Sequence, residues 1–476
     1  MSLKIKLLLC LGFLVLLLGF VFAGIIIGGT RRATEGLEKI RALGEPTRVA
    51  DIAFDAEVPR SDLHERLKRF GSIHDRSVTI SLGDDSVADE LTELEHWPEG
   101  RSAAPIVAEF LSCIWKEKPA PEEYSWSDLL EACLDPRRLD QLSECERRGL
   151  AALRLLNEPC VPAALEVCAA TRETGEFAAR EWRPALGLLQ MDDAPALYST
   201  TITLSATIPA LLEDSSTEEA RARTDSILTL AWNTRGIPNV MAHLFWMHTV
   251  HHGLIGCRYV MASRAETLDW SRARALLADF DSRANFERAL IGERAFTIEL
   301  FQALADGTLS TESDDFIAPG EMPLFWKISN QYDLALYLEI FETALARSRA
   351  EEWSPMPDAV DPARFTWWAP MSKLLVPNLD RQRALALVLD AEIRVTRAAL
   401  EAYEHGAAAA QELAAILRDP FDGQPLRTRL EDGVLVLWSI GPDQIDDGGS
   451  SEAGEPEQAG RRFDDARDIV CRVRLR

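Results

Sequence analysis

Basic residues are in short supply in this chain. Its 476 residues include 51 Lys and Arg against 76 Asp and Glu, so the formal net charge is −25 at pH 7. Because binding to a phosphate backbone needs a basic face, this charge argues against nucleic acid as a partner. It argues equally against docking on anionic lipid head groups. Divalent cations and basic proteins are the partners that such an acidic chain would attract.

Contiguous motifs of the common enzyme classes are missing as well. The chain contains no GxSxG nucleophile elbow, no GxxxxGKS/T or GxGxxG nucleotide loop, no HExxH pair and no CxxCH haem site. Its eight cysteines form no CxxC pair, which argues against a zinc knuckle. Catalytic groups that meet only in the fold would escape such a search. We therefore favour a non-enzymatic protein and identify no small-molecule substrate.

Charged residues are absent from residues 7–29, LLLCLGFLVLLLGFVFAGIIIGG. At the standard rise, a helix of this length covers roughly 34 Å, which is enough to cross a bilayer. A signal peptide cleaved after Ala23 is the alternative, but the apolar run continues past that position through Ile27. We expect an uncleaved anchor whose residues 7–29 lie in the lipid bilayer.

The charges that flank the anchor orient it weakly. Lys4, Lys6 and the amino terminus precede it, whereas Arg31, Arg32, Lys39 and Arg41 follow it, so the positive-inside rule by itself leans weakly against export of the C-terminal part. A short tail ahead of a long acidic chain favours a signal anchor in the inner or cytoplasmic membrane of a bacterium. The C-terminal ectodomain would then be exported, in a compartment where disulfides can form.

Changes in hydrophobic periodicity divide the remainder of the chain. Apolar positions three or four residues apart predict an irregular, mainly helical ectodomain, and the lack of a fixed-period repeat argues against a solenoid. The helical segments are expected near 102–117, 143–156, 162–181, 218–232, 238–262, 271–305 and 328–349. We predict an N-terminal tail at 1–6, the anchor at 7–29, a stalk and entry segment at 30–76, a helical domain at 77–350, a Pro/Trp-rich connector at 351–378 and an α+β module at 379–476.

Two of these regions carry finer predictions. In the entry segment, Leu37, Ile40 and Leu43 are spaced for one face of a short helix that Gly44 and Pro46 should end. In the helical domain, SVTISL at 77–82 alternates and predicts a short strand.

The C-terminal module, residues 379–476, combines both periodicities. Apolar steps of three and four predict a helix over 379–404 and a second over 407–417. Beyond them PLRTRL, VLVLW and IVCRVRL read as about three antiparallel strands, the second of them central. Asp432-Gly433 tolerates positive φ and should form the first hairpin turn. The last strand should expose one basic face.

An acidic loop joins the last two predicted strands, from Ser439 to Asp468. Ca²⁺ takes six to eight oxygen ligands in flexible geometry, and carboxylates from both ends of the loop would close on one ion. Gly448 and Gly449 allow a sharp turn and offer carbonyl oxygens. A solvated acidic loop is the alternative. The candidate ligands are Asp443, Asp446, Asp447, Asp465 and Asp468.

The order of motifs in this module resembles the C-terminal domain of the major pseudopilin of type II secretion. After a helix with Tyr403 and Gly406 near its end, the chain shows LRDPFDGQPLRTR, then GVLVLWSIGPDQIDDGG and DDARDIV. That family has a long helix, a hairpin and a Ca²⁺ loop with aspartates near its two ends. The resemblance implies a Ca²⁺ ion held by Asp443 at one end and by Asp465 and Asp468 at the other.

The chain departs from the pseudopilin pattern at its N-terminus. A pilin anchor runs directly into the long helix, whereas here residues 7–29 lie far upstream, and no pilin leader precedes them. The whole chain is also similar to large families of membrane-anchored bacterial proteins that have no assigned activity. These likenesses imply a scaffolding or interaction role in the cell envelope, with other envelope proteins as partners.

Four of the eight histidines lie in MAHLFWMHTVHHGLIGC, residues 241–257. On a helix His248 and His252 share a face, and two imidazoles at this spacing can bind Zn²⁺ or Cu²⁺. Glu266 or Asp269 would have to supply a third ligand. The apolar neighbours favour instead a packed helix with histidines at its polar edge, or a pH-sensitive contact. An exported metalloenzyme that uses His248 and His252 is the alternative function.

Overall fold

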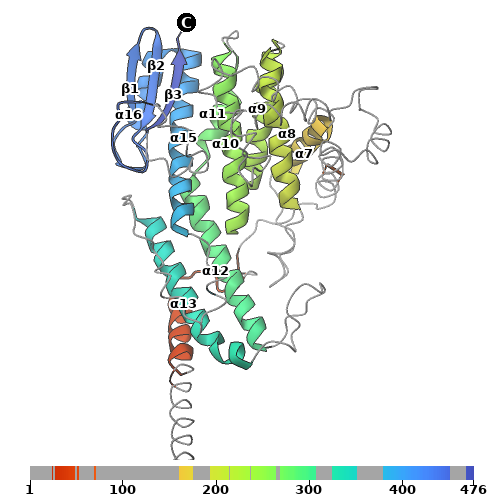
Figure 1. The fold of residues 1–476 in the computed structure, drawn as a ribbon, viewed down its shortest axis with the longest axis vertical. Coiled ribbons are helices and arrows are strands. Elements are labelled where there is room, and N and C mark those ends of the chain that lie inside the picture. The colour runs from red at the N-terminus through yellow and green to blue at the C-terminus, as the bar shows by residue number, and fades with distance from the viewer. Residues whose placement is uncertain are drawn as a thin grey trace, which may run out of the picture.

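The computed structural model describes the chain in segments: residue 24 and residues 27–48, 51–52, 69–70, 160–174, 193–213, 215–235, 237–263, 268–306, 324–350, 372, 379–450 and 468–475. Within these residues the protein is mainly helical and has one small antiparallel sheet, as predicted (Figure 1). The expected strand at 77–82, the helices near 102–117 and 143–156, nearly all of the connector and Asp465 lie outside the described residues.

The described elements follow one another from α7 to β3. The helices are α7 (Val161–Thr174), α8 (Asp193–Glu213), α9 (Thr217–Thr234), α10 (Val240–Ala262), α11 (Ser271–Ala278), α12 (Ser282–Asp306), α13 (Leu324–Arg349), α15 (Leu379–His405) and α16 (Ala407–Ile416). The strands are β1 (Arg427–Glu431), β2 (Val434–Ser439) and β3 (Ile469–Arg474). We call α7 to α13 the helical body. A further helix, the entry helix, spans residues 27–42.

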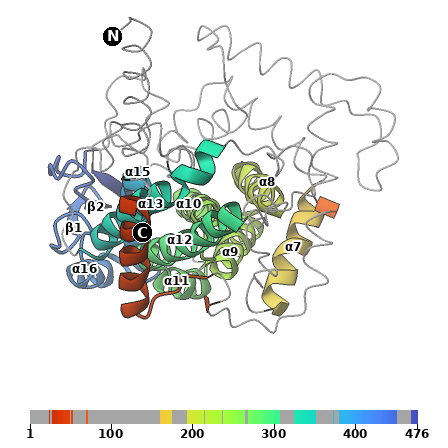
Figure 2. The ribbon, with the colours of Figure 1, turned by 90° about the horizontal axis from the view of Figure 1, so that it is seen from below.

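Three helices of the body, α8, α9 and α10, pack side by side (Figures 1 and 2). The first turn of α9 carries Glu218 and Glu219, which complement the positive end of the helix dipole. Asn239 caps α10 by accepting a hydrogen bond from the amide of Ala242 at 3.0 Å. Because α10 contacts α8, α9, α12 and α15, nearly its whole circumference is covered.

Helix α8 is an element that periodicity does not predict. Its middle, YSTTITLSATI, is rich in the β-branched residues that favour strands. In the structure the hydroxyls of Thr200, Thr201 and Thr207 donate to backbone carbonyls three or four residues earlier in the helix. The buried hydroxyls are therefore satisfied within the helix, and packing against α9 and α10 outweighs the local propensity.

Helix α15 lies between the helical body and the sheet and packs against both. One side of it contacts α10 and α12, and another contacts β2 and β3 (Figure 1). The predicted helix at 379–404 is confirmed, but its burial exceeds the predicted apolar stripe: no residue from 382 to 404 is exposed. Alanines such as Ala391, Ala398 and Ala399 are buried between the stripe positions, because small side chains let neighbouring elements approach closely.

The sheet has the order β1-β2-β3, with both pairs antiparallel and β2 in the centre, as predicted. Asp432 and Gly433, with φ of 49° and 76°, form the predicted hairpin turn. Inward positions of β2 and β3 pair as Leu435 with Val473 and join the core around α15. Arg472 and Arg474 alternate with them and are exposed, so the basic face is also confirmed.

The entry helix begins the described chain and packs along α13 (Figure 1). Ile40 is fully buried and Gly44, with φ of 70°, follows the helix end, as expected. Leu43 is 56% exposed, because it lies past the last helical turn and so leaves the face that it was expected to share. Among the described residues no helix is long and apolar enough to cross a membrane. Of the predicted anchor, only residues 24 and 27–29 are described.

Candidate functional site

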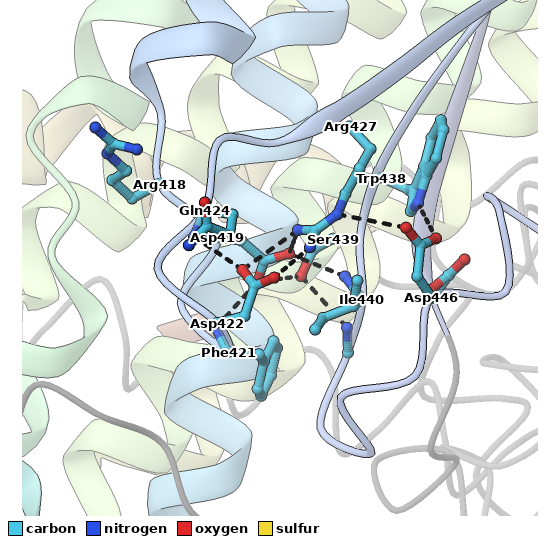
Figure 3. Close-up of polar contacts among 12 residues, drawn as sticks. Arg418, Asp419, Phe421, Asp422, Gln424, Arg427, Trp438, Ser439, Ile440 and Asp446 are labelled. Carbon is cyan, nitrogen blue, oxygen red and sulfur yellow. Dashed lines mark hydrogen bonds and ion pairs between the residues drawn. The ribbon is translucent and has the colours of Figure 1, made fainter.

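The segment after α16 folds into a tight loop at the base of the sheet (Figure 3). The amide of Asp419 donates to the carbonyl of Gln424 at 2.6 Å, and the amide of Gly423 donates to the carbonyl of Asp419 at 2.9 Å. Gly423 has a φ of 70°, which glycine adopts without steric cost. The sequence DPFDGQP thus closes on itself and holds the side chain of Asp419 toward the end of β2.

The carboxylate of Asp419 is fully buried and ties this loop to β2. Its Oδ1 accepts hydrogen bonds from the amide of Phe421 at 3.0 Å and from Oγ of Ser439 at 2.9 Å. Its Oδ2 accepts from the amide of Ile440 at 2.9 Å and from Nη1 of Arg427 at 2.6 Å. Both oxygens are therefore satisfied by hydrogen bonds, one of them from a guanidinium group.

Arg427 supplies the positive charge that the neighbouring aspartates need. Besides Asp419, its guanidinium binds Asp422, and its Nε lies 3.7 Å from Oδ2 of Asp446 (Figure 3). Burial lowers the pKa of Arg427, but the hydrogen bond to Asp422 and the charges of all three carboxylates outweigh burial and raise it. One arginine on β1 therefore links the loop after α16 with the acidic loop after β2.

The acidic loop uses two of its predicted ligands for its own turns. Oδ1 of Asp446 accepts from Nε1 of Trp438 and from the amide of Gly448, both at 2.9 Å. Oδ1 of Asp443 accepts from the amide of Ile445 at 3.0 Å. These contacts shape the backbone as Asx turns do, which is a structural role for both carboxylates.

Asp468 occupies a different environment at the far end of the loop. Its Oδ2 accepts from the amide of Gly449 at 2.7 Å, whereas its Oδ1 is buried and finds no hydrogen-bond donor among the residues that the structure describes. Burial raises the pKa of Asp468, hydrogen bonds from the backbone of Gly449 and Asp447 lower it in part, and the charges of Asp446 and Asp447 raise it. The structure thus brings Asp446, Asp447 and Asp468 within electrostatic reach of one another.

A Ca²⁺ ion fits part of this donor set. The free Oδ1 of Asp468 and the two adjacent carboxylates are the hard oxygens that Ca²⁺ prefers. The glycine carbonyls, by contrast, are already used: Arg429 donates to Gly448 at 2.7 Å and Arg472 donates to Gly449 at 3.0 Å. Across the described part of the chain, no group of three or more His, Cys, Asp or Glu is arranged to hold a metal ion.

The histidine cluster lies between α8 and α10. The ring centroids of His248 and His252 are 4.3 Å apart. His248 stacks on Tyr198 at 4.3 Å, and Nδ1 of His252 lies 2.8 Å from Oγ of Ser205. His251 points elsewhere, with its Nδ1 2.8 Å from Oε2 of Glu392 on α15. The i,i+4 spacing therefore places two rings in direct contact, as expected.

Burial keeps these two rings neutral. It lowers the pKa of His248 to about 3 and that of His252 well below its ordinary value, and the adjacent imidazoles contribute in the same direction. His252 lies inside the bundle rather than at a polar edge, because α10 is covered on nearly all sides. Nε2 of His248 is buried and has no hydrogen-bond partner in the described part of the chain. Of the suggested third ligands, Asp269 accepts from the amide of Ser271 at 2.9 Å, and Glu266 lies outside the described residues.

Asp419 and Arg427 are the central residues of the site, and neither is among the site residues predicted from the sequence. Each appears in the sequence only as part of LRDPFDGQPLRTR. The turn residues in DPFDGQP are a signal for a closed loop. A basic residue a few positions later, at the start of a strand, is a candidate counterion for the aspartates of that loop.

Comparison with known proteins adds no relative. No family model, no curated protein and no solved structure matches the chain. The resemblance to the pseudopilin C-terminal domain therefore stays a prediction that the quoted motifs support.

Proposed function

We propose that this protein is a single-pass, exported membrane protein of the bacterial cell envelope with a non-enzymatic scaffolding or interaction role. The observation that carries the proposal is the use of charged groups in the C-terminal module. Arg427 pairs with Asp419, Asp422 and Asp446 and so links two loops to the sheet. Such a satisfied network stabilises a surface for partners.

Residues 7–29 anchor the protein in this proposal. The support is the charge-free sequence and the packing of the residues that follow it. Glu45, just beyond the entry helix, binds Arg294 of α12 at 2.6 Å and Arg349 of α13 at 2.6 Å. The ectodomain is thus joined to the anchor side of the chain by ion pairs, one of which involves a fully buried arginine side chain.

The acidic loop binds Ca²⁺ structurally in the same proposal. Asp468 is the central ligand, because its buried Oδ1 lacks a hydrogen bond. Asp446 and Asp447 are the adjacent carboxylates. Burial is the main cause of the raised pKa of Asp468, and the ion would offset both the burial of this carboxyl group and its repulsion from the other two. Asp443 and Asp465 are the further ligands that the pseudopilin resemblance implies.

Thermal unfolding of the full-length protein in detergent, in EDTA and then in millimolar CaCl₂, tests the calcium site. Ca²⁺ at a hundred times its Kd should stabilise the folded state by about 2.7 kcal/mol. Asp468→Asn should abolish the calcium-dependent shift. Asp432→Asn, which removes a charge from the β1–β2 turn, should keep it. Equal shifts in both variants, or none in the wild type, would reject the site.

A metalloenzyme that uses His248 and His252 is the second candidate function. The observation that favours it is the buried Nε2 of His248. In the described part of the chain this nitrogen of a neutral ring has no hydrogen-bond partner, so it could ligate a metal ion, and a second neutral imidazole lies beside it. Metal analysis after dialysis against Zn²⁺ or Cu²⁺ tests it. His248→Ala should lose bound metal, whereas His405→Ala, at an exposed position, should retain it. Identical metal content in the two variants would exclude the site.

A further inference from the structure

Strand β1 is the outer edge of the sheet. Within the described part of the chain it pairs with β2 alone, whereas β3, the other outer strand, lies beside α15 and the helical body (Figure 1). Glu431 and Val434 flank the two-residue turn and so form a hydrogen-bonded pair. Because such pairs alternate along an antiparallel ladder, the N–H and C=O groups of Thr428 and Leu430 point away from β2, to the open edge.

Apolar side chains accompany this open edge. Leu430 is 51% exposed, and Ile416, at the end of α16, is 72% exposed. Helix α16 packs against β1, and both lie at the same margin of the molecule in the two views (Figures 1 and 2). The sequence of α16, AAAAQELAAI, contains one charged residue, Glu412, although charged residues make up 27% of the chain. This margin thus presents apolar side chains next to backbone groups that can pair with another strand.

Arg429 and Glu431 place opposite charges on one face of β1, on either side of Leu430. Their side chains pair with each other at 2.7 Å, and both are roughly half exposed. A strand that docks on the edge of β1 would bring its own side chains directly opposite these two charges. The charge pattern of the incoming strand therefore decides whether it fits.

The charge pattern of β1 is complementary to itself. When two copies of β1 run antiparallel and Leu430 faces Leu430 of the second copy, Arg429 faces Glu431 in both halves of the pair, and the outward backbone groups face each other. Centring the pair on Thr428 instead places Arg427 opposite Arg429. Centring it on Arg429 or on Glu431 places a charge opposite its own copy, and like charges in these positions are destabilising.

We propose that β1 pairs with β1 of a second copy of this chain, antiparallel and centred on Leu430, so that two three-stranded sheets join into one. Such a contact is closed, because the same surface serves both partners. Backbone hydrogen bonds supply the affinity, and the facing Arg429 and Glu431 select the register. The inference goes beyond the proposed scaffolding role, since it names a surface and its partner, and it does not depend on the anchor or on Ca²⁺.

Sedimentation velocity of the full chain in detergent tests the self-association. In detergent the predicted anchor does not impose a common orientation on the two copies, so the contact can form whatever its geometry relative to a bilayer. The wild type should shift from monomer to dimer as its concentration rises. A wild type that stays monomeric at the highest soluble concentration would overturn the inference.

Charge reversals test the register. Arg429→Glu places two acidic side chains opposite each other in both halves of the pair, and Glu431→Arg places two basic ones, so each variant alone should dimerise roughly tenfold more weakly than the wild type. In a mixture of the two variants each reversed charge faces its complement, so heterodimers should form. Arg474→Glu, the same charge change on the exposed face of β3, should dimerise like the wild type. Folded variants whose mixture associates no better than each alone would reject the register.

Leu430→Pro tests the backbone pairing. Proline removes the outward N–H of residue 430, whereas the ladder to β2 uses the backbone groups of Arg429 and Glu431 and stays intact. This variant should lose the dimer. Leu430→Ala is the control, because it removes the apolar side chain but keeps the N–H, and it should retain a weakened dimer. Equal dissociation constants in the two variants would show that the edge of β1 is not hydrogen-bonded to a second copy.

Discussion

Two buried carboxyl groups, one in the C-terminal module and one in the helical body, have opposite kinds of hydrogen-bond partners. Asp419 receives the guanidinium of Arg427, two amides and a hydroxyl. Within the described residues, the carboxyl group of Glu293 of α12 accepts from neutral donors, Nδ2 of Asn239 at 2.9 Å and the amide of Val240 at 3.3 Å. Burial raises the pKa of Glu293 to about 7.

The difference shows how the cost of burying a carboxyl group can be met. A cation and several donors satisfy both oxygens of Asp419 inside the protein. The N-terminus of α10 offers Glu293 a partial positive charge, but this does not offset the cost of desolvating the carboxylate. The protonated form of Glu293 is therefore favoured up to nearly neutral pH. The C-terminal module thus depends on an ion pair, whereas the helical body contains a group that titrates.

Removal of the cation should have the largest effect. Arg427→Ala leaves Asp419 buried without its counterion, which should cost about 3–5 kcal/mol in the free energy of unfolding measured with urea. Arg429→Ala on the same strand breaks a half-exposed pair with Glu431 and an exposed hydrogen bond to the carbonyl of Gly448. It should therefore cost less, roughly 1–2 kcal/mol. Similar losses in the two variants would contradict the central role of Arg427.

The titrating group should reveal itself in the pH dependence of stability. Because folding raises the pKa of Glu293, the wild type loses stability as pH rises from about 4.5, where the unfolded chain ionises, to about 7. Glu293→Gln stays neutral and should be more stable than the wild type by about 3 kcal/mol at pH 8, yet equal at pH 4. Urea unfolding at the two pH values measures this difference. The exposed Glu412→Gln serves as control, and a pH-independent effect of Glu293→Gln would refute the raised pKa.

A smaller effect should separate backbone strain from packing in the acidic loop. Gly449 has a φ of 72°, and a Cβ there would lie 3.0 Å from the ring of Trp438. Gly433 has a similar φ of 76°, but a Cβ there meets no atom within 4 Å. Each alanine variant should lose about 1–2 kcal/mol through positive φ, as measured by thermal unfolding. Gly449→Ala should lose more, and an equal loss would show that the contact with Trp438 relaxes freely.

Regular local patterns in the sequence predicted much of the fold. The helices at α9, α10, α13, α15 and α16, the Asp432-Gly433 turn and the strand order follow from periodicity and turn chemistry. One expected helix at 271–305 is instead two, α11 and α12, separated by residues 279–281. Both halves retain apolar spacing, so a window that averages over the break does not detect it.

The candidate site was predicted less completely for a physical reason. The sequence located the acidic loop, and it placed His248 and His252 on one helix face, since that depends only on helical spacing. It did not show that Arg427 neutralises the aspartates, because this pairing requires a closed loop and a strand register. Nor did it show that His252 would be buried, since burial depends on α8, α9 and α15 packing around α10.

The amino-acid sequence alone determined the mainly helical class, the small antiparallel sheet and the acidic balance, because these depend on composition and on neighbours a few residues apart. Only the tertiary structure decided which charges meet. Arg294 pairs with Glu45, which lies 249 residues earlier in the sequence. Arg427 joins two separate loops. Such contacts depend on long-range packing. The chain has many acidic residues, and the folded geometry determines which of them lies close enough to pair with a given arginine.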